Sequence, residues 1–187
     1  MTPREVINFL NIVGALKTNT RHCYTQLDRK ESVADHVWRT ALIPLLIQND
    51  FPDVDMNKVI KMILIHDLGE AVTGDIPVFA KTQSNEETEE IAIEKLLENL
   101  PNDIRSNFKE LFLEMSALET KEAKLYKALD NMEAVISHNE SPLSTWLPLE
   151  YELNLTYGED KVAFSEWLKE LKSECNEDTR KKIEKGE

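Results

Sequence analysis

A histidine followed directly by an aspartate, His66-Asp67, closes an apolar helical stretch over residues 59–65. An imidazole nitrogen and a carboxylate oxygen placed side by side at a helix exit can bind the same divalent metal ion. By chance, about one in four chains of this composition contains such a dipeptide. The residues around it must therefore show whether it binds a metal. Two further candidate ligands, His36 and Asp130, lie on separate predicted helices. The four residues together predict the metal centre of a hydrolase.

The helical period places these candidates on inward faces. His36 shares a face of its predicted helix with Val33 and Thr40, and Asp130 follows the apolar Leu129. A carboxylate among apolar side chains loses hydration and is costly unless it pairs with a cation. Each residue taken singly is compatible with an ordinary buried histidine or a solvated carboxylate, but their order on successive helices favours a shared metal ion.

The hydrophobic period is helical almost throughout, with no alternation of strands and helices. The polar, aperiodic segment from Lys17 to Lys30 is predicted to be a loop, and the charged segment from residue 176 is predicted to fray. The sequence therefore predicts one all-α domain, a helical bundle over residues 1–175, and a charged C-terminal tail over 176–187. The expected helices cover about 3–16, 32–49, 55–67, 84–99, 101 onward, 120–138, 144–155 and 159–174.

Capping residues set the starts of these helices. Ser32, Asp55 and Thr120 each precede an apolar periodic run, as N-caps do. Ser84 with Glu87 has the spacing of a capping box and is predicted to open the fourth helix.

Charge and composition exclude several classes of protein. The net charge of −13 argues against a protein that binds nucleic acid polymers or anionic membranes. Residues 1–80, which hold most candidate site residues, carry 8 Lys/Arg against 10 Asp/Glu and are nearly neutral. The longest apolar run, near residues 41–47, contains Pro44, so no membrane-spanning helix is expected. Cys23 and Cys175 lack zinc-site spacing, and with no visible signal peptide they predict a cytoplasmic protein.

The order His…His-Asp…Asp on successive helices resembles the HD-domain superfamily of metal-dependent phosphohydrolases, and within it the 5′-deoxynucleotidase branch. The resemblance covers about residues 16–140 and implies a single HD-domain-like helical bundle. It also implies an enzyme that removes the phosphate from (deoxy)nucleoside 5′-monophosphates. Four stretches carry it: 16–21, 31–36, 66–77 and 127–134.

The same resemblance implies roles for the chemically able residues. Glu70 and Asp75 would align or deprotonate the attacking water and protonate the leaving oxygen, in an order that the sequence leaves open. The bound ion would be Mn²⁺, Co²⁺, Fe²⁺ or Ni²⁺, with Mg²⁺ or Zn²⁺ also compatible. One divalent ion would be held by His36, His66, Asp67 and Asp130.

Substrate contacts are expected near the N-terminus and after the metal pair. Arg21 matches the arginine that binds phosphate in the family, because its planar guanidinium donates two parallel hydrogen bonds. Relatives often carry tryptophan next, whereas this chain has histidine, so His22 is expected as a polar contact and Tyr24 as a stacking surface. Thr73 and Lys81 are further phosphate candidates.

Two alternative functions stay open. One is hydrolysis of another phosphate ester, such as a phosphodiester, a nucleoside triphosphate or a sugar phosphate, because fold does not fix substrate. The other is a catalytically silent regulatory or interaction domain. A homodimer is expected from the resemblance, with apolar stripes on the later helices as its contact surface.

Overall fold

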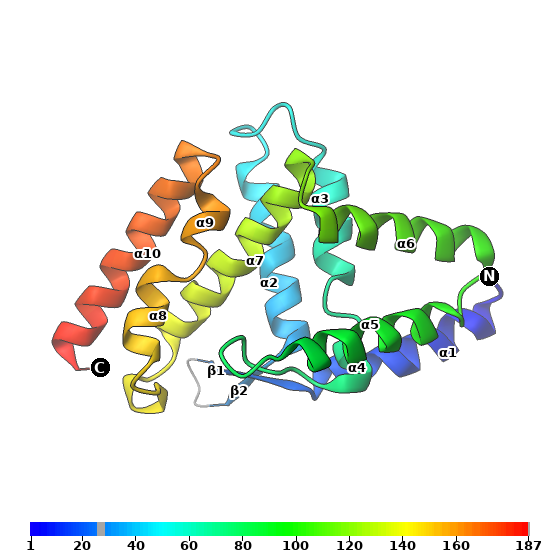
Figure 1. Ribbon diagram of the computed structural model, residues 1–187, viewed down its shortest axis with the longest axis horizontal. Helices are drawn as coiled ribbons and strands as arrows, with labels where there is room; N and C mark the ends of the chain where they lie inside the picture. The colour runs from blue at the N-terminus through cyan, green and yellow to red at the C-terminus, as the bar shows by residue number, and fades with distance from the viewer. Residues whose placement is uncertain (26–28, 187) are drawn as a thin grey trace.

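The computed structural model describes residues 1–25 and 29–186 and is mostly helical, as predicted (Figure 1). None of the described helices combines the length and the apolar character needed to cross a lipid bilayer. In chain order the helices are α1 (Pro3–Val13), the 3-10 turn η1 (Gly14–Lys17), α2 (Val33–Ile47), α3 (Met56–Ile65), α4 (Glu70–Thr73), α5 (Gln83–Leu97), α6 (Asn102–Ala117), α7 (Lys121–Glu140), the 3-10 turn η2 (Leu143–Thr145), α8 (Glu150–Thr156), α9 (Glu159–Val162) and α10 (Glu166–Lys185).

Helix α7 forms the centre of the fold. Figure 1 shows it running obliquely between α2 and α3 on one side and α8, α9 and α10 on the other. Its residues Leu125, Leu129, Met132 and Val135 are almost completely buried. Because α7 packs on both groups of helices, polar side chains on its inward face are also enclosed, and Asp130 is one of them.

Two short strands replace part of the predicted loop. β1 (Thr20–Tyr24) pairs antiparallel with β2 (Lys30–Ser32), with an irregular register between their ends. The loop prediction for Lys17 to Lys30 is therefore wrong over β1 and at Lys30, and its residues 26–28 lie outside the described part of the chain. Strands this short show too little alternation to be distinguished from a polar loop.

The N-caps were mostly predictable. Ser32, Asp55 and Thr120 accept hydrogen bonds from the first turns of α2, α3 and α7, as expected. The predicted capping box at Ser84 is wrong, because α5 begins two residues earlier with Thr82 as its N-cap. Both residues offer a hydroxyl with a polar partner three positions on, so the local pattern fits either start.

The C-terminal segment does not fray. Helix α10 continues to Lys185, and Thr179 is fully buried within the segment expected to be a tail; residue 187 lies outside the described residues. The Thr179 hydroxyl donates to Asn139 Oδ1 of α7 at 2.8 Å and accepts from Asn154 Nδ2 of α8 at 3.0 Å. Composition alone missed this, because the buried residue beyond position 176, Thr179, makes polar rather than apolar contacts.

Exposed apolar side chains lie mainly on early helices rather than on the later ones. Leu10 of α1 is exposed, and on α2 Trp38 and Leu46 are 65% and 80% exposed. By contrast Trp146 is buried, and Trp167 packs against the core. The expectation that the apolar stripes lie on the later helices is therefore wrong, since those stripes are used to pack α8 and α10 onto α7.

Gly158, between α8 and α9, has a left-handed backbone with φ +78°. A Cβ there would lie 2.9 Å from Met132 Cε and 3.0 Å from Asn131 Cβ. We expect Gly158→Ala to lower the free energy of unfolding by about 2 kcal/mol or more, from backbone strain and overpacking. Gly14→Ala is the control, because a Cβ at Gly14 meets no heavy atom within 4 Å. Urea unfolding of both variants tests this, and equal stabilities would contradict the close approach at Gly158.

Candidate active site

The four predicted metal ligands converge at the junction of α2, α3 and α7. His36 Nε2 lies 3.1 Å from Asp130 Oδ1, and His66 Nε2 lies 3.1 Å from Asp67 Oδ1 and 3.5 Å from Asp130 Oδ1. The ligand atoms of His36, His66 and Asp67 all lie within 4.8 Å of one another. The structure therefore brings together side chains that are separated by up to 94 residues in the chain.

Some buried polar atoms at this junction have no hydrogen-bond partner, and a bound cation would satisfy them. The ring of His66 uses Nδ1–H to donate to the Ile63 carbonyl at 2.7 Å, so Nε2 is the nitrogen that faces the cluster and could exchange its proton for a metal ion. Among the described residues, His66 Nε2 and Asp67 Oδ2 are buried and have no hydrogen-bond partner. Buried polar atoms are rarely left unpaired, so two imidazoles and two carboxylates here fit one divalent ion.

The electrostatics of the cluster point the same way. Burial alone would raise the pKa of Asp67, but the neighbouring His66 and His36 lower it to about 2. Burial alone would lower the pKa of His66, yet Asp67 and Asp130 raise it well above its usual value. The buried carboxylates of Asp67 and Asp130 thus stabilise positive charge at the cluster, and the same interaction favours binding of a cation.

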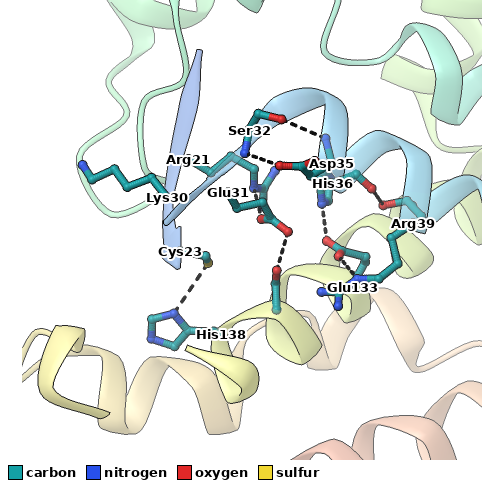
Figure 2. Close-up of polar contacts among 12 residues, drawn as sticks. Arg21, Cys23, Lys30, Glu31, Ser32, Asp35, His36, Arg39, Glu133 and His138 are labelled. Atoms are coloured by element: carbon teal, nitrogen blue, oxygen red, sulfur yellow. Dashed lines mark hydrogen bonds and ion pairs between the residues drawn. The ribbon is translucent and has the colours of Figure 1, made fainter. Parts of the chain in front are cut away.

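Glu133 orients one of the histidines. Figure 2 shows His36 and Arg39 of α2 meeting the fully buried Glu133 of α7. His36 Nδ1–H donates to Glu133 Oε2, and Arg39 Nε donates to Glu133 Oε1 at 2.6 Å, while Arg39 Nη1 donates to Glu140. This pairing directs His36 Nε2 toward the cluster. Sequence reasoning missed Glu133, although its place one turn after Asp130 on an otherwise buried face was a usable signal.

A cavity of about 470 Å³ opens beside the cluster. Asp67 and Asp130 contribute to its wall, together with several predicted catalytic and substrate-binding residues. Its volume is in the range of small-molecule sites. The predicted residues in the wall are Arg21, His22, Glu70, Asp75 and Lys81.

Two predicted substrate residues do not reach this cavity. The Thr73 hydroxyl donates to the Gly74 carbonyl at 3.1 Å, and Thr73 lines a separate cavity of about 330 Å³. Tyr24 exchanges backbone hydrogen bonds with the Ser141 hydroxyl and does not line either cavity. The stacking surface expected from Tyr24 is therefore not provided by this conformation.

Arg21 is held by a second buried glutamate. Its Nε lies 3.2 Å from Glu31 Oε2 (Figure 2). The Ser137 hydroxyl donates to Glu31 Oε1 at 2.5 Å. Burial opposes a charge on Arg21, but Asp67 and other nearby acidic groups raise its pKa, so it stays cationic. The contact with Glu31 is an ion pair without hydrogen-bond geometry, and Arg21 lines the cavity, so its guanidinium can donate to an anion there. Glu31 was not predicted as a site residue.

Glu70 and Asp75 have the proton affinities of acid–base groups. Burial raises the pKa of Glu70 to about 9, with Asp67 and Asp75 adding to the rise. Burial also raises the pKa of Asp75, although Arg21 opposes it. Glu70 Oε2 is buried and has no hydrogen-bond partner among the described residues. Both carboxyls therefore hold a proton more readily than a solvated carboxyl does, which suits groups that accept and return protons.

The far wall of the cavity holds a second group of polar side chains, of which the sequence predicted only His22. His22 Nε2 lies 3.2 Å from Glu150 Oε1, and Cys23 Sγ lies 3.6 Å from His138 Nδ1. Burial lowers the pKa of His138 to about 4, so that ring is neutral. Lys127 also lines the cavity and contacts Asp130.

The sequence profile of the HD domain family matches residues 13–172. The chain belongs to this family. The resemblance drawn from its residues is thereby confirmed, and so is the helical fold class. The profile covers α2, α3 and α7, the three elements that supply the cluster.

Relatives of this HD domain carry a consistent name. Human 5′-deoxynucleotidase HDDC2 is 32% identical over 141 residues, which are 73% of this chain and 68% of the human protein. The fission yeast Schizosaccharomyces pombe 5′-deoxynucleotidase hdd1 is 31% identical over 140 residues, 70% of this chain and 69% of the relative. Among solved structures, a predicted metal-dependent phosphohydrolase from Magnetospirillum magnetotacticum MS-1 superposes with a TM-score of 0.80 at 25% identity, covering 98% of this chain and 93% of that one.

We expect Glu133→Ala to lower the free energy of unfolding of this HD domain by about 3–5 kcal/mol, because it leaves His36 and Arg39 without their buried counter-charge. Glu140→Ala removes the other, more exposed partner of Arg39 and should cost about 0–1 kcal/mol. Denaturant unfolding at neutral pH measures both. A loss at Glu133 no larger than at Glu140 would show that the buried pair does not support the fold.

Proposed function

We propose that this HD domain is a metal-dependent phosphohydrolase that removes the 5′-phosphate from nucleoside monophosphates, with deoxynucleotides as its main substrates. The observation that carries the proposal is the convergence of two histidines and two aspartates, with both aspartates in the wall of a cavity. That cavity also presents an arginine and two carboxyls of raised pKa. The 5′-deoxynucleotidase names of the relatives support the substrate class.

The cofactor is one divalent metal ion held by His36, His66, Asp67 and Asp130. Mixed nitrogen and oxygen ligands favour Mn²⁺, Co²⁺, Fe²⁺ or Ni²⁺, and they also accept Mg²⁺ or Zn²⁺. When bound, such an ion acidifies a coordinated water and neutralises charge on phosphoryl oxygens. The unpartnered atoms His66 Nε2 and Asp67 Oδ2 support this assignment within the described chain.

Residues of the cavity wall supply the remaining chemistry. The guanidinium of Arg21 binds the substrate phosphate, and its ion pair with Glu31 holds it at the cavity wall. Glu70 and Asp75 accept the proton of the attacking water and return one to the leaving 5′-oxygen. Lys81 is paired with Glu89 at 2.6 Å and contributes positive charge at the rim.

The nucleoside extends from the phosphate toward the far wall. His22, which follows the phosphate-binding Arg21 along β1, contacts the sugar as a polar group. Its ring lies edge-on to Phe79, with centroids 5.5 Å apart, so an apolar surface adjoins it. The histidine ring is smaller than the tryptophan that relatives often carry at this position. His22 should therefore exclude a ribose 2′-hydroxyl less strictly than a tryptophan would.

The protein acts in the cytoplasm as a homodimer. Both cysteines are free, which suits a reducing compartment. The exposed apolar side chains of α1 and α2, including Leu10, Trp38 and Leu46, supply a surface for self-association. Light scattering at micromolar concentration gives the oligomeric state.

Metal removal tests the activity. Protein treated with a chelator should release no phosphate from dAMP, dGMP, dCMP or TMP, and Mn²⁺ or Co²⁺ should restore release. Asp130→Asn should prevent restoration while leaving the helical circular dichroism unchanged, whereas Asp160→Asn, at the rim of the same cavity, should be restored like the parent. Ribonucleotides run in parallel measure the sugar preference. No metal-dependent release from any phosphate ester would rule out the enzyme.

Glu70→Gln and Asp75→Asn test the acid–base pair. Each keeps the size of the side chain but removes its titration, so we expect kcat to fall by about 10²–10⁴-fold. Metal binding should persist, because neither residue belongs to the ligand set. Full activity in either variant would remove that residue from the mechanism.

A further inference from the structure

The two oxygens of Asp130 face different partners. Oδ1 lies 3.1 Å from His36 Nε2 and 3.5 Å from His66 Nε2, so it points to the centre of the ligand cluster. Oδ2 lies 2.7 Å from the ammonium nitrogen of Lys127. One carboxylate therefore spans a cationic side chain and the proposed metal position.

Lys127 reaches Asp130 by helix geometry. The two residues stand three positions apart on α7, a spacing that places them on the same face. Lys127 also lines the cavity, with its side chain one-third exposed, so its ammonium group lies at the border between the cluster and the space for substrate.

Carboxylates bind divalent ions through one oxygen or through both. A lysine that occupies one oxygen at hydrogen-bond distance leaves only the other for the ion. If the second carboxylate oxygen does not bind the ion, a coordination position stays open. Water or a phosphate oxygen can then occupy it.

We propose that Lys127 is a positioning residue that restricts Asp130 to single-oxygen binding and thereby keeps a coordination position open for water and substrate. The inference rests on the metal site proposed above. Lys127 acts through Asp130 and does not itself bind the ion.

Lys127 should change metal affinity in the opposite direction to an ordinary supporting residue. Lysine carries a positive charge close to a divalent cation, so it weakens the binding of the ion while favouring turnover. Loss of an ordinary supporting residue loosens a metal site. Loss of Lys127 should tighten it, because repulsion is relieved and the second carboxylate oxygen becomes available.

The experiment compares Lys127→Met with the parent protein and with Lys161→Met. Lys161 lines the same cavity but pairs with Asp160 at 2.7 Å, so it controls for the loss of one positive charge. Co²⁺ dissociation constants are measured by competition with a chelating dye. The visible absorption of the Co²⁺-loaded proteins reports coordination number, since the bands weaken as ligands are added.

We expect Lys127→Met to bind Co²⁺ about tenfold more tightly than the parent or more, with weaker visible bands and slower phosphate release. Lys161→Met should match the parent in affinity and spectrum. Lys127→Arg should restore the parental spectrum, because a guanidinium also donates to Oδ2. Lys127→Gln, which is neutral but polar, gives the same comparison of affinity if the methionine variant does not fold.

An unchanged or weaker affinity in both neutral variants, with a parental spectrum, would overturn the role of Lys127 while leaving the metal site intact. If the parent and Lys161→Met fail to bind Co²⁺ at all, the proposed metal site itself fails.

Discussion

The burial of Asp130 on the central helix is the constraint on which the rest of this structure depends. A carboxylate enclosed by α2, α3 and α7 is unstable in the core unless positive charge or hydrogen-bond donors surround it. His36 and His66 are brought to one of its oxygens and Lys127 to the other. The three helices must therefore pack together at the position of Asp130 along α7. The buried apolar residues of α7 on either side of Asp130 fix this position.

Two further buried carboxylates, those of Glu133 and Glu31, are also stabilised by cationic side chains or hydrogen-bond donors. Glu133 accepts from His36 and from Arg39, while Glu31 holds Arg21 and accepts from Ser137. Each carboxylate is stabilised by a cationic partner, so negative charge can be concentrated in the interior without unfolding it. As a result, His36 and Arg21, the proposed metal ligand and the proposed phosphate-binding residue, each pair with a buried glutamate that does not line the cavity.

Helical period and capping predicted the core helices, because the apolar residues of α2, α3 and α7 recur at helical spacing. The convergence of His36, His66, Asp67 and Asp130 was predictable because histidine and aspartate on an inward face require a partner. Glu31, Glu133 and Lys127 were not found, since a single glutamate or lysine in a helical pattern reads as a solvated side chain. The partners of Glu31 and Glu133 lie about 10 to 106 positions away, so the pairing itself leaves no local signal, and only the place of Glu133 one turn after Asp130 hinted at its role. Lys127 pairs with Asp130 only three positions away, but this spacing is equally common for solvated pairs on a helix.

Polar contacts also explain why the C-terminal helix was misjudged. Thr179 and Lys172 of α10 are buried, and Lys172 donates to the Asn154 carbonyl of α8 at 2.9 Å. A hydrogen bond that involves a charged group contributes about 1.5–3 kcal/mol to stability, more than one between neutral groups. Helix α10 thus holds α8 in place, and α8 and the turn after it carry Glu150, Leu153 and Tyr157 into the cavity wall. The segment that composition marks as a solvated tail therefore supports the surface opposite the metal ligands.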